Sequence, residues 1–365
     1  MTIEVDPGVL VVGAGPTGLA AAIELARHGT PVRIIDRKAG PTALSKAVGI
    51  AARSLELLEP SGATERLLAR GRRLTHIRFH HADREIAALD FGQLRHRFAF
   101  LLCLPQHETE VIMADVLAGL GIEVQRQTEL VGLRQAGDGV LVELVGPDGR
   151  AIIRVGCVFG ADGIHSRVRE QAGLRFEGHQ HERRWSIADV VLEDWPFDPH
   201  AGHAFLHANG DIGFVIPIGE RRWRAVSNTE DAMSRIGGRR AREHVVQRDV
   251  FELPVRQSAS YQAGSVYIGG DAAHVHSPVG ARGMNLGIED AAAFARRFEA
   301  GELAGYTAER RPPGRDWIRF SERLLGAAQE HRPLRIRLRN AGLRLVGHLP
   351  MLQRRIVSRV SGLAR

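Results

Sequence analysis

The pattern of apolar positions predicts a β-α-β unit at the start of the chain. Residues 9–12 (Val-Leu-Val-Val) form a short β-branched run that is typical of a buried strand. Residues 19–27 repeat apolar side chains at helical spacing, and the His-Gly pair at 28–29 is a helix-ending signal. A second β-branched run at 32–35 ends in Asp36. We therefore expect a strand, a helix and a second, parallel strand.

The later pattern predicts many short strands and a few helices. A Gly-Pro-Asp-Gly turn at 146–149 between two strand-like runs is typical of a β-meander. Helices are expected from residue 105 to about residue 117 and over 291–298. Strands are expected within 77–100 and at 140–144, 152–155, 158–163, 186–191, 204–207, 214–217, 223–226 and 266–268.

A glycine-rich loop separates the first expected strand from the first helix. It consists of Gly13, Ala14, Gly15, Pro16, Thr17 and Gly18. A G-x-G-x-x-G motif in this position is typical of dinucleotide binding. The first glycine permits a tight turn, the second lets the backbone approach a pyrophosphate, and the third lets the helix pack on the sheet. Asp36 is placed to accept hydrogen bonds from the hydroxyls of an adenosine ribose.

Composition and charge exclude several classes of protein. Apolar residues make up 44% and charged residues 25% of the 365 residues, which excludes a disordered or collagen-like chain. The net charge is +7, but residues 332–365 hold nine arginines and no acid, and this leaves −2 for the rest of the chain. A basic character confined to one end does not indicate nucleic acid as a partner.

Cysteine and histidine positions give no sign of a metal or disulfide framework. Two cysteines, Cys103 and Cys157, are too few for either. His274 and His276 have no further ligands clustered near them, so we expect them to pack in a loop or to contact substrate. The sequence opens without a secretory signal pattern, and no apolar run reaches the length of about 18 residues that a membrane span needs. We expect a cytoplasmic protein.

The last part of the chain predicts a pair of amphipathic helices. Leu334, Leu338 and Leu345 recur at helical spacing, and so do the apolar residues at 352, 356 and 360, with arginines between them. We expect the apolar faces to pack on the body of the protein as a cap. Contact with an anionic membrane surface is the less favoured alternative.

Three motifs, taken in order, identify a family. They are GAGPTG at 13–18, GADGIHSRVR at 160–169 and GGDAAHVHSPVGARGMN at 269–285. Together they resemble the class A flavoprotein monooxygenases, the family of para-hydroxybenzoate hydroxylase. The resemblance implies an α/β fold with a Rossmann-like FAD-binding domain of the GR2 type. It also implies that a β-sheet substrate domain interrupts this domain and that a C-terminal helical segment follows.

On this resemblance we expect three regions along the chain. The FAD-binding domain is discontinuous, over 1–75, 101–175 and 263–300. The β-rich substrate domain covers 76–100 and 176–262, and the C-terminal helical region covers 301–365. The residues that the resemblance assigns to the cofactor are Gly13, Ala14, Gly15, Pro16, Thr17, Gly18, Asp36, Arg37, Lys46, Arg53, Gln106, Asp162, Gly163, Gly270, Asp271, Pro278, Gly280, Gly283, Met284 and Asn285. Lys46 stands where the family usually has an arginine, and a lysine lacks the planar fork of a guanidinium.

The resemblance also implies an activity. FAD would be bound non-covalently, NADPH or NADH would be the reductant and O₂ the co-substrate. A flavin C4a-hydroperoxide would hydroxylate an electron-rich aromatic or polyketide-like substrate, and no protein side chain is nominated as the acid or base. The alternatives are an FAD-dependent reductase or halogenase of the same fold, or a flavin-binding protein without turnover. A halogenase is disfavoured because its W-x-W-x-I-P motif is absent. The expected assembly is a monomer or homodimer.

Overall fold

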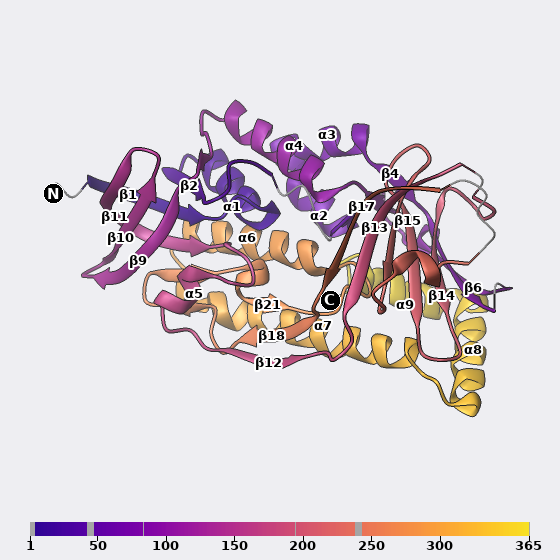
Figure 1. Ribbon diagram of the computed structural model, residues 1–365. Coiled ribbons are helices and arrows are strands. Elements are labelled where there is room, and N and C mark those ends of the chain that lie inside the picture. The colour runs from indigo at the N-terminus through magenta and orange to yellow at the C-terminus, as the bar shows by residue number, and fades with distance from the viewer. Residues whose placement is uncertain (1–3, 42–46, 83, 194, 238–242, 365) are drawn as a thin grey trace.

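Two large β-sheets occupy opposite ends of the molecule, and long helices run between them (Figure 1). The computed structural model describes residues 4–41, 47–82, 84–193, 195–237 and 243–364. The two sheets share no strand. The expectation of a mixed α/β fold with a helical C-terminal segment is confirmed.

The first sheet has eight strands in the order β19-β20-β11-β1-β2-β8, with β10 paired to β11 and β9 to β10. Its central strand, β1, pairs in parallel with both β2 and β11. Residues 9–12 of β1 are buried, as a continuous apolar run in a parallel strand requires. The strands are β1 (Glu4–Val12), β2 (Val32–Asp36), β8 (Gln125–Arg126), β9 (Glu129–Ala136), β10 (Gly139–Gly146), β11 (Gly149–Gly160), β19 (Gln262–Ala263) and β20 (Val266–Ile268).

Helices pack beside this sheet. Helix α1 (Pro16–Arg27) follows β1 and contacts both α4 (Gln106–Gly119) and α6 (Gly283–Glu299). Three shorter helices are α2 (Ala52–Leu58), α3 (Ala63–Arg70) and α5 (Arg167–Gln171). The β-α-β unit predicted from the first 36 residues is therefore present as β1, α1 and β2.

The second sheet has seven strands in the order β17-β13-β16-β15-β14-β5-β6. One face of this sheet packs in a hydrophobic core that includes Trp223, Ala225 and Phe205. Because side chains alternate along a strand, Arg224 and Val226 point to the other face. The strands are β5 (His76–His81), β6 (Arg84–Asp90), β13 (Trp185–Leu192), β14 (Ala201–Leu206), β15 (Ile212–Pro217), β16 (Arg222–Ser227) and β17 (Glu243–Phe251).

Two small sheets lie outside the large ones. One is β12 (Phe176–Gln180), β18 (Pro254–Ser258) and β21 (His274–Val275), and the other is β3 (Gly49–Ile50), β7 (Leu101–Cys103) and β4 (Arg72–Leu74). Strands β12 and β18 fall within the range that the sequence analysis gave to the β-rich domain. In the structure β12 pairs with β18, and β18 pairs with β21, which lies within the third motif, rather than with the seven-stranded sheet.

The long helix α7 (Tyr306–Ala328) lies in the expected C-terminal helical region, and it continues through residues 312–314, which read Pro-Pro-Gly, a triplet that usually ends a helix. Contacts from the body support it at this point. Gln257 Nε2 donates a hydrogen bond to the carbonyl oxygen of Arg311 at 2.8 Å. A Cβ on Gly314 would lie 2.7 Å from the hydroxyl of Tyr261, so only glycine fits there. Tertiary packing thus outweighs local helix propensity.

The chain ends in the two expected helices, α8 (Pro333–His348) and α9 (Pro350–Val360), which pack on β6. The expectation that the α8 leucines face the body is wrong. Leu334, Leu338 and Leu345 are 69%, 64% and 56% exposed, whereas Ile336 and Asn340 are buried. A shift of two positions turns a side chain by roughly 200° around a helix, so the leucines point away from the body. No described helix is long and apolar enough to span a bilayer.

Candidate functional site

The glycines of the β1–α1 loop meet different steric surroundings. Gly13 has a φ of +101°, and a Cβ there would lie 2.4 Å from the carbonyl oxygen of Ala161. A Cβ on Gly18 would lie 1.8 Å from the carbonyl oxygen of Gly13. A Cβ on Gly15 would meet no atom within 4 Å. The loop is therefore held tightly by protein at its two ends, and Gly15 is the point where a ligand can approach the backbone.

The first turn of α1 and Asp36 lie on either side of this loop. No side chain caps α1 and its first turn has no acid, so no side chain of this turn offsets the positive end of the helix. The Asp36 carboxylate, at the end of β2, accepts hydrogen bonds from the backbone N–H groups of Ala14 at 2.7 Å and Lys38 at 2.8 Å. Arg37 is exposed next to it. Lys46 lies outside the described residues.

Asp162, in the second motif, joins the end of β11 to the start of α5. Its carboxylate accepts hydrogen bonds from the hydroxyl of Ser166 and from the backbone N–H of Arg167 at 2.7 Å. Burial raises the pKa of Asp162, and these hydrogen bonds oppose that effect. Gly163 has a φ of +83°, which turns the chain after the acid. The carbonyl oxygen of Ala161 then lies against the glycine-rich loop, so the second motif supports the first.

Thr17 brings the first motif against the third. A Cβ on Gly270 would lie 2.4 Å from the Thr17 hydroxyl oxygen, and one on Gly287 would lie 2.1 Å from it. Gly270 also has a φ of +59°. Both glycines are needed for α1 to pack against α6 and the turn that follows β20. Asp271, the acid of this turn, is exposed.

The loop over 278–285 leads into α6. Gly280 has a φ of +90° and Ala281 a φ of +52°, so two successive residues are left-handed and turn the chain sharply. A Cβ on Gly280 would lie 2.7 Å from the indole ring of Trp317, so α7 supports the loop. Helix α6 begins without a side-chain cap and without an acid in its first turn. Pro278 is exposed, and Gly283 and Met284 are partly exposed.

The side chain of Asn285 is committed to protein contacts. Its Oδ1 accepts hydrogen bonds from the backbone N–H of Ala51 at 2.7 Å and from the hydroxyl of Ser54 at 2.8 Å. Its Nδ2 donates to the carbonyl oxygens of Gly49 at 2.9 Å and Ala281 at 2.7 Å. The side chain therefore fastens the 278–285 loop to β3 and α2. What Asn285 can offer a cofactor is its backbone N–H in the first turn of α6.

The sequence analysis missed Asp290, a fully buried carboxylate of α6. It accepts hydrogen bonds from the backbone N–H of Gly270 at 3.0 Å, from His274 Nε2 at 2.6 Å and from Arg310 Nε at 2.7 Å. Burial alone would raise the pKa of Asp290, but the charges of His274 and Arg310 hold it below its ordinary value. The network fixes the Gly270 turn to both α6 and α7. The sequence signal that could have predicted Asp290 is an acidic residue on the apolar face of a helix.

His276 is a neutral packing residue. Its Nδ1 lies 2.8 Å from the carbonyl oxygen of Ser277 and donates to it, which leaves the proton off Nε2. Burial lowers the pKa of His276 to about 3. The ring packs edge-on against Trp317, with 6.2 Å between centroids. This position agrees with the expected loop-packing role.

Two other expected cofactor residues form hydrogen bonds with nearby protein groups. Gln106 is the first residue of α4, and its Nε2 donates to Glu110 Oε1 at 2.7 Å. Arg53 Nη1 donates to Glu56 Oε2 at 2.9 Å, and the Arg53 backbone N–H donates to the carbonyl oxygen of Ser361. Arg53 therefore lies beside the end of α9.

A buried ion pair joins two strands of the seven-stranded sheet, and no sequence motif predicts it. Arg224 of β16 and Asp189 of β13 are 1% and 3% exposed, and they form two hydrogen bonds of 2.6 and 2.8 Å. Gln247 also donates to Asp189, at 2.7 Å. Arg224 Nη1 reaches the carbonyl oxygen of Ala47 at 3.3 Å. The pair thus positions the chain at Ala47 against the sheet.

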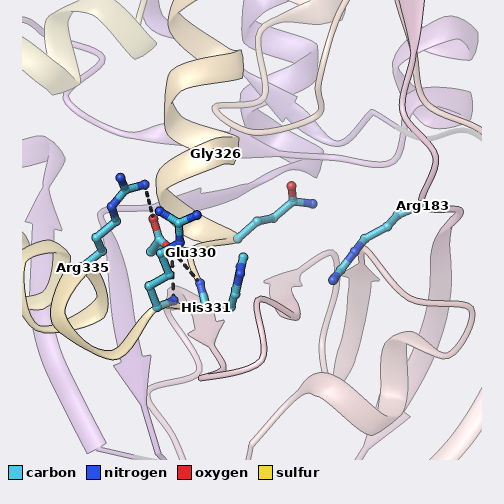
Figure 2. A pocket seen from close by; sticks show the side chains of 7 residues that line it. Arg183, Gly326, Glu330, His331 and Arg335 are labelled. Carbon is cyan, nitrogen blue, oxygen red and sulfur yellow. Dashed lines mark hydrogen bonds and ion pairs between the residues drawn. The ribbon is translucent and has the colours of Figure 1, made fainter.

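The cavity in Figure 2 lies elsewhere, at the corner between α7 and α8. Its volume is about 360 Å³, and Arg183 reaches toward it from the side opposite Glu330 (Figure 2). Its lining residues belong to none of the three motifs. We therefore do not assign the redox site to this cavity.

The residues of the three motifs fit a dinucleotide cofactor. Helices α1 and α6 both begin without side-chain caps, and Gly15 leaves its backbone approachable. The Asp36 carboxylate lies beside the glycine-rich loop, where it bonds the Ala14 N–H, and Asp271 is exposed in the Gly270 turn. A helix N-terminus of this kind is a ready anion site, which suits a pyrophosphate.

Comparison with known proteins identifies the family. The family described as "FAD binding domain" matches residues 6–321. The 6-methylpretetramide 4-monooxygenase of Streptomyces rimosus is 35% identical over the whole chain, which spans 71% of that relative. The pentachlorophenol 4-monooxygenase of Sphingobium chlorophenolicum is 33% identical over 78% of the chain, which spans 57% of that relative.

A solved structure gives the same fold over the full length. The p-nitrophenol 4-monooxygenase from Pseudomonas putida DLL-E4 superposes with a TM-score of 0.91, covering 100% of both chains at 22% identity. This likeness concerns the fold, and the sequence relatives carry the family assignment. The resemblance inferred from the three motifs is confirmed. The chain belongs to the class A flavoprotein monooxygenases, FAD-dependent enzymes that use NAD(P)H and O₂.

Proposed function

We propose that this enzyme hydroxylates an electron-rich aromatic ring, in a phenol or a polyketide-like polycyclic compound. Its relatives are named as 4-monooxygenases of 6-methylpretetramide and of pentachlorophenol. Those names come from proteins of which this chain spans 71% and 57%. The substrate class is therefore our inference, and it rests on the features of this chain that follow.

The observation that carries the proposal is an apolar seam between the seven-stranded sheet and the 278–285 loop. Phe214 and Val226 lie on the sheet face that carries Arg224, and they pack in one cluster with Val279 of the loop. Their side chains are partly exposed rather than buried. We propose that a flat apolar ring would lie against these side chains beside the loop, with most of its surface removed from water.

A second group of apolar side chains extends this seam. Ile77 and Ile216 of the sheet pack in the same cluster as Ala281 of the loop and Trp317 of α7. Aromatic and aliphatic side chains with few polar groups are the usual lining of a site for a small aromatic molecule. The seam favours an aromatic substrate over a charged or strongly polar one.

We propose the three regions stated from the sequence as the domain arrangement, with 1–75, 101–175 and 263–300 holding FAD. The residues that we assign to FAD are those named from the sequence, which are the residues selected there from the three motifs together with Asp36, Arg37, Lys46, Arg53 and Gln106. The open surroundings of Gly15 and the two uncapped helix starts support this assignment. The side-chain contacts of Asn285 and Arg53 point to indirect roles for these two residues.

The chemistry that bound FAD supplies is acceptance of hydride from NAD(P)H and transfer of one oxygen atom from O₂ to the substrate. The protein would bind the cofactor and the substrate and orient them toward each other. The start of α1 and Gly15 would face the pyrophosphate, and Asp36 and Asp271 would accept hydrogen bonds from hydroxyl groups. The positive end of α6 would stabilise negative charge on a flavin ring held at the start of that helix. The apolar seam excludes water from the reacting groups.

The experiment that tests the proposal is a panel of phenols and polycyclic aromatic compounds with the FAD-loaded enzyme. A true substrate should accelerate NAD(P)H oxidation and give a product heavier by one oxygen atom. A poor analogue should give NAD(P)H oxidation with hydrogen peroxide and unchanged analogue. A panel that yields only reduced products would replace the proposal with the reductase alternative, and no turnover at all would favour a flavin-binding protein.

The remaining expectations are proposals of the same kind. NAD(P)H-dependent turnover suits the cytoplasm, where the reductant is available. We expect a monomer or homodimer with no nucleic-acid partner, because the excess positive charge is confined to residues 332–365. Size-exclusion chromatography with light scattering measures the oligomeric state, and a gel-shift assay measures nucleic-acid binding.

A further inference from the structure

A cluster of metal-ligand side chains lies outside the three motifs and has no part in the proposed reaction. It consists of His179 of β12, His181 just beyond that strand, and Glu322 of α7. The potential ligand atoms of the three side chains all lie within 4.8 Å of one another. His179 is exposed, and the other two are partly exposed, so an ion from solution can reach the cluster.

The backbone brings the two histidines to the same side. Residues two apart on a strand point to one face, and His181 continues the strand direction because its N–H donates to the carbonyl oxygen of Leu253. The imidazole rings are 5.3 Å apart between centroids. A His-x-His pair on an extended segment therefore presents two ring nitrogens toward α7.

Glu322 completes the arrangement from the helix. One of its carboxylate oxygens lies 3.2 Å from His179 Nε2, and the other lies 3.1 Å from His181 Nε2. In a tetrahedral zinc site the metal–ligand distances of about 2.0–2.1 Å place neighbouring ligand atoms roughly 3.3 Å apart. The two Nε2–oxygen separations are close to this spacing, and each joins a different oxygen of the carboxylate. Without a metal, each Nε2 must carry a proton to bond the carboxylate, and a metal ion would take the place of those two protons.

We propose that His179, His181 and Glu322 bind a divalent transition-metal ion of the Zn²⁺ type. Two imidazoles and one carboxylate suit this class of ion better than Mg²⁺ or Ca²⁺, which prefer oxygen ligands. Three protein ligands leave a fourth position for water. The metal binds from solution and needs neither FAD nor substrate.

The site would join two supports of the 278–285 loop. Strand β12 pairs with β18, and β18 pairs with β21, which leads into that loop. On the other side, Glu322 is five residues after Trp317, whose ring lies against Gly280. Five residues of helix span roughly 7.5 Å. A bound ion would therefore fix α7 to the small sheet on which the loop is built, and we infer a stabilising site.

Zn²⁺ titration of the FAD-loaded enzyme, purified without a histidine tag, tests the proposal. Isothermal calorimetry should show one saturable site, and Zn²⁺ should raise the melting temperature. His179→Ala, His181→Ala and Glu322→Gln should each weaken binding by at least the roughly 10–100-fold that loss of a supporting partner costs. Binding should also weaken as the pH falls, because protons compete for the imidazoles.

The matched control is His28→Ala, which removes a surface histidine that lies 3.9 Å from a single carboxylate, that of Glu299. This variant should bind Zn²⁺ like the wild type. Circular dichroism of each variant checks that the fold is retained. The proposal is overturned if wild-type enzyme shows no saturable Zn²⁺ binding, or if the three variants bind as tightly as His28→Ala. Neither result bears on the monooxygenase assignment, because substrate turnover is not measured.

Discussion

Replacing His276 by asparagine should change how the stability of the protein depends on pH. The Nδ1–H of His276 donates to the carbonyl oxygen of Ser277, and an asparagine Nδ2 can make the same hydrogen bond. Among the described residues, His276 Nε2 has no hydrogen-bond partner. The substitution therefore removes the titrating nitrogen while it keeps the contact that the structure shows.

The size of the effect follows from the pKa of His276, which burial lowers to about 3. An unfolded histidine titrates near pH 6.5, so between the two values the unfolded chain binds a proton that the folded chain does not. The free energy of unfolding must then fall as the pH falls. Between about pH 7 and about pH 5 this single group should cost roughly 2 kcal/mol.

Urea titrations at these two pH values, followed by tryptophan fluorescence with FAD saturating, measure the effect. On acidification, the free energy of unfolding should fall by roughly 2 kcal/mol more for the wild type than for His276→Asn. A constant difference between the two proteins would reflect altered packing alone. His348→Asn, at an exposed position, controls for the removal of one histidine. Equal pH dependence in wild type and His276→Asn would refute the buried, neutral imidazole.

Three further substitutions test other parts of the structure. Gly15→Val should fold normally, because a Cβ there meets no protein atom within 4 Å, but should purify with little FAD, as judged from absorbance near 450 nm. Asp290→Asn should lower the free energy of unfolding by about 3 kcal/mol, because it removes the carboxylate that the buried Arg310 Nε bonds at 2.7 Å and leaves Arg310 with Glu289 at 3.4 Å. Because the pKa of Asp290 is lowered in the fold, the wild-type advantage should persist at pH 5 and be lost only as the pH falls below about 4. Val357→Ala, at a position 1% exposed, should cost about 2 kcal/mol, whereas Leu338→Ala should stay within about 0.5 kcal/mol; a large cost at Leu338 would mean that its side chain is covered in solution.

The elements that the sequence predicted are those whose signals are local. The β1–α1–β2 unit has a β-branched run, a glycine-rich loop and an amphipathic helix in succession, and each signal needs only neighbouring residues. The steric roles of Gly13 and Gly18 could also be stated beforehand, because the turn and the helix packing are fixed by chain geometry. The family followed from three such motifs in order.

The features that escaped prediction depend on residues far apart in the sequence. Helix α7 continues through Pro312-Pro313-Gly314, and the contacts from Gln257 and Tyr261 that support it there come from about 50 residues away. The pairs Asp189–Arg224 and Asp290–Arg310 lie on separate elements and follow no motif. The direction of the α8 leucines depends on which face packs on β6, and periodicity alone cannot decide that. Local patterns therefore locate elements, while tertiary contacts decide their partners.

We propose that this chain inserts one atom of molecular oxygen into an aromatic ring. The most direct measurement is turnover of the substrate found in the panel under ¹⁸O₂, with NAD(P)H and FAD-loaded enzyme, followed by mass spectrometry of the product. We expect one ¹⁸O atom in each product molecule and none when the label is supplied as H₂¹⁸O. A product that carries no ¹⁸O from O₂, or that takes its oxygen from water, would contradict the proposal.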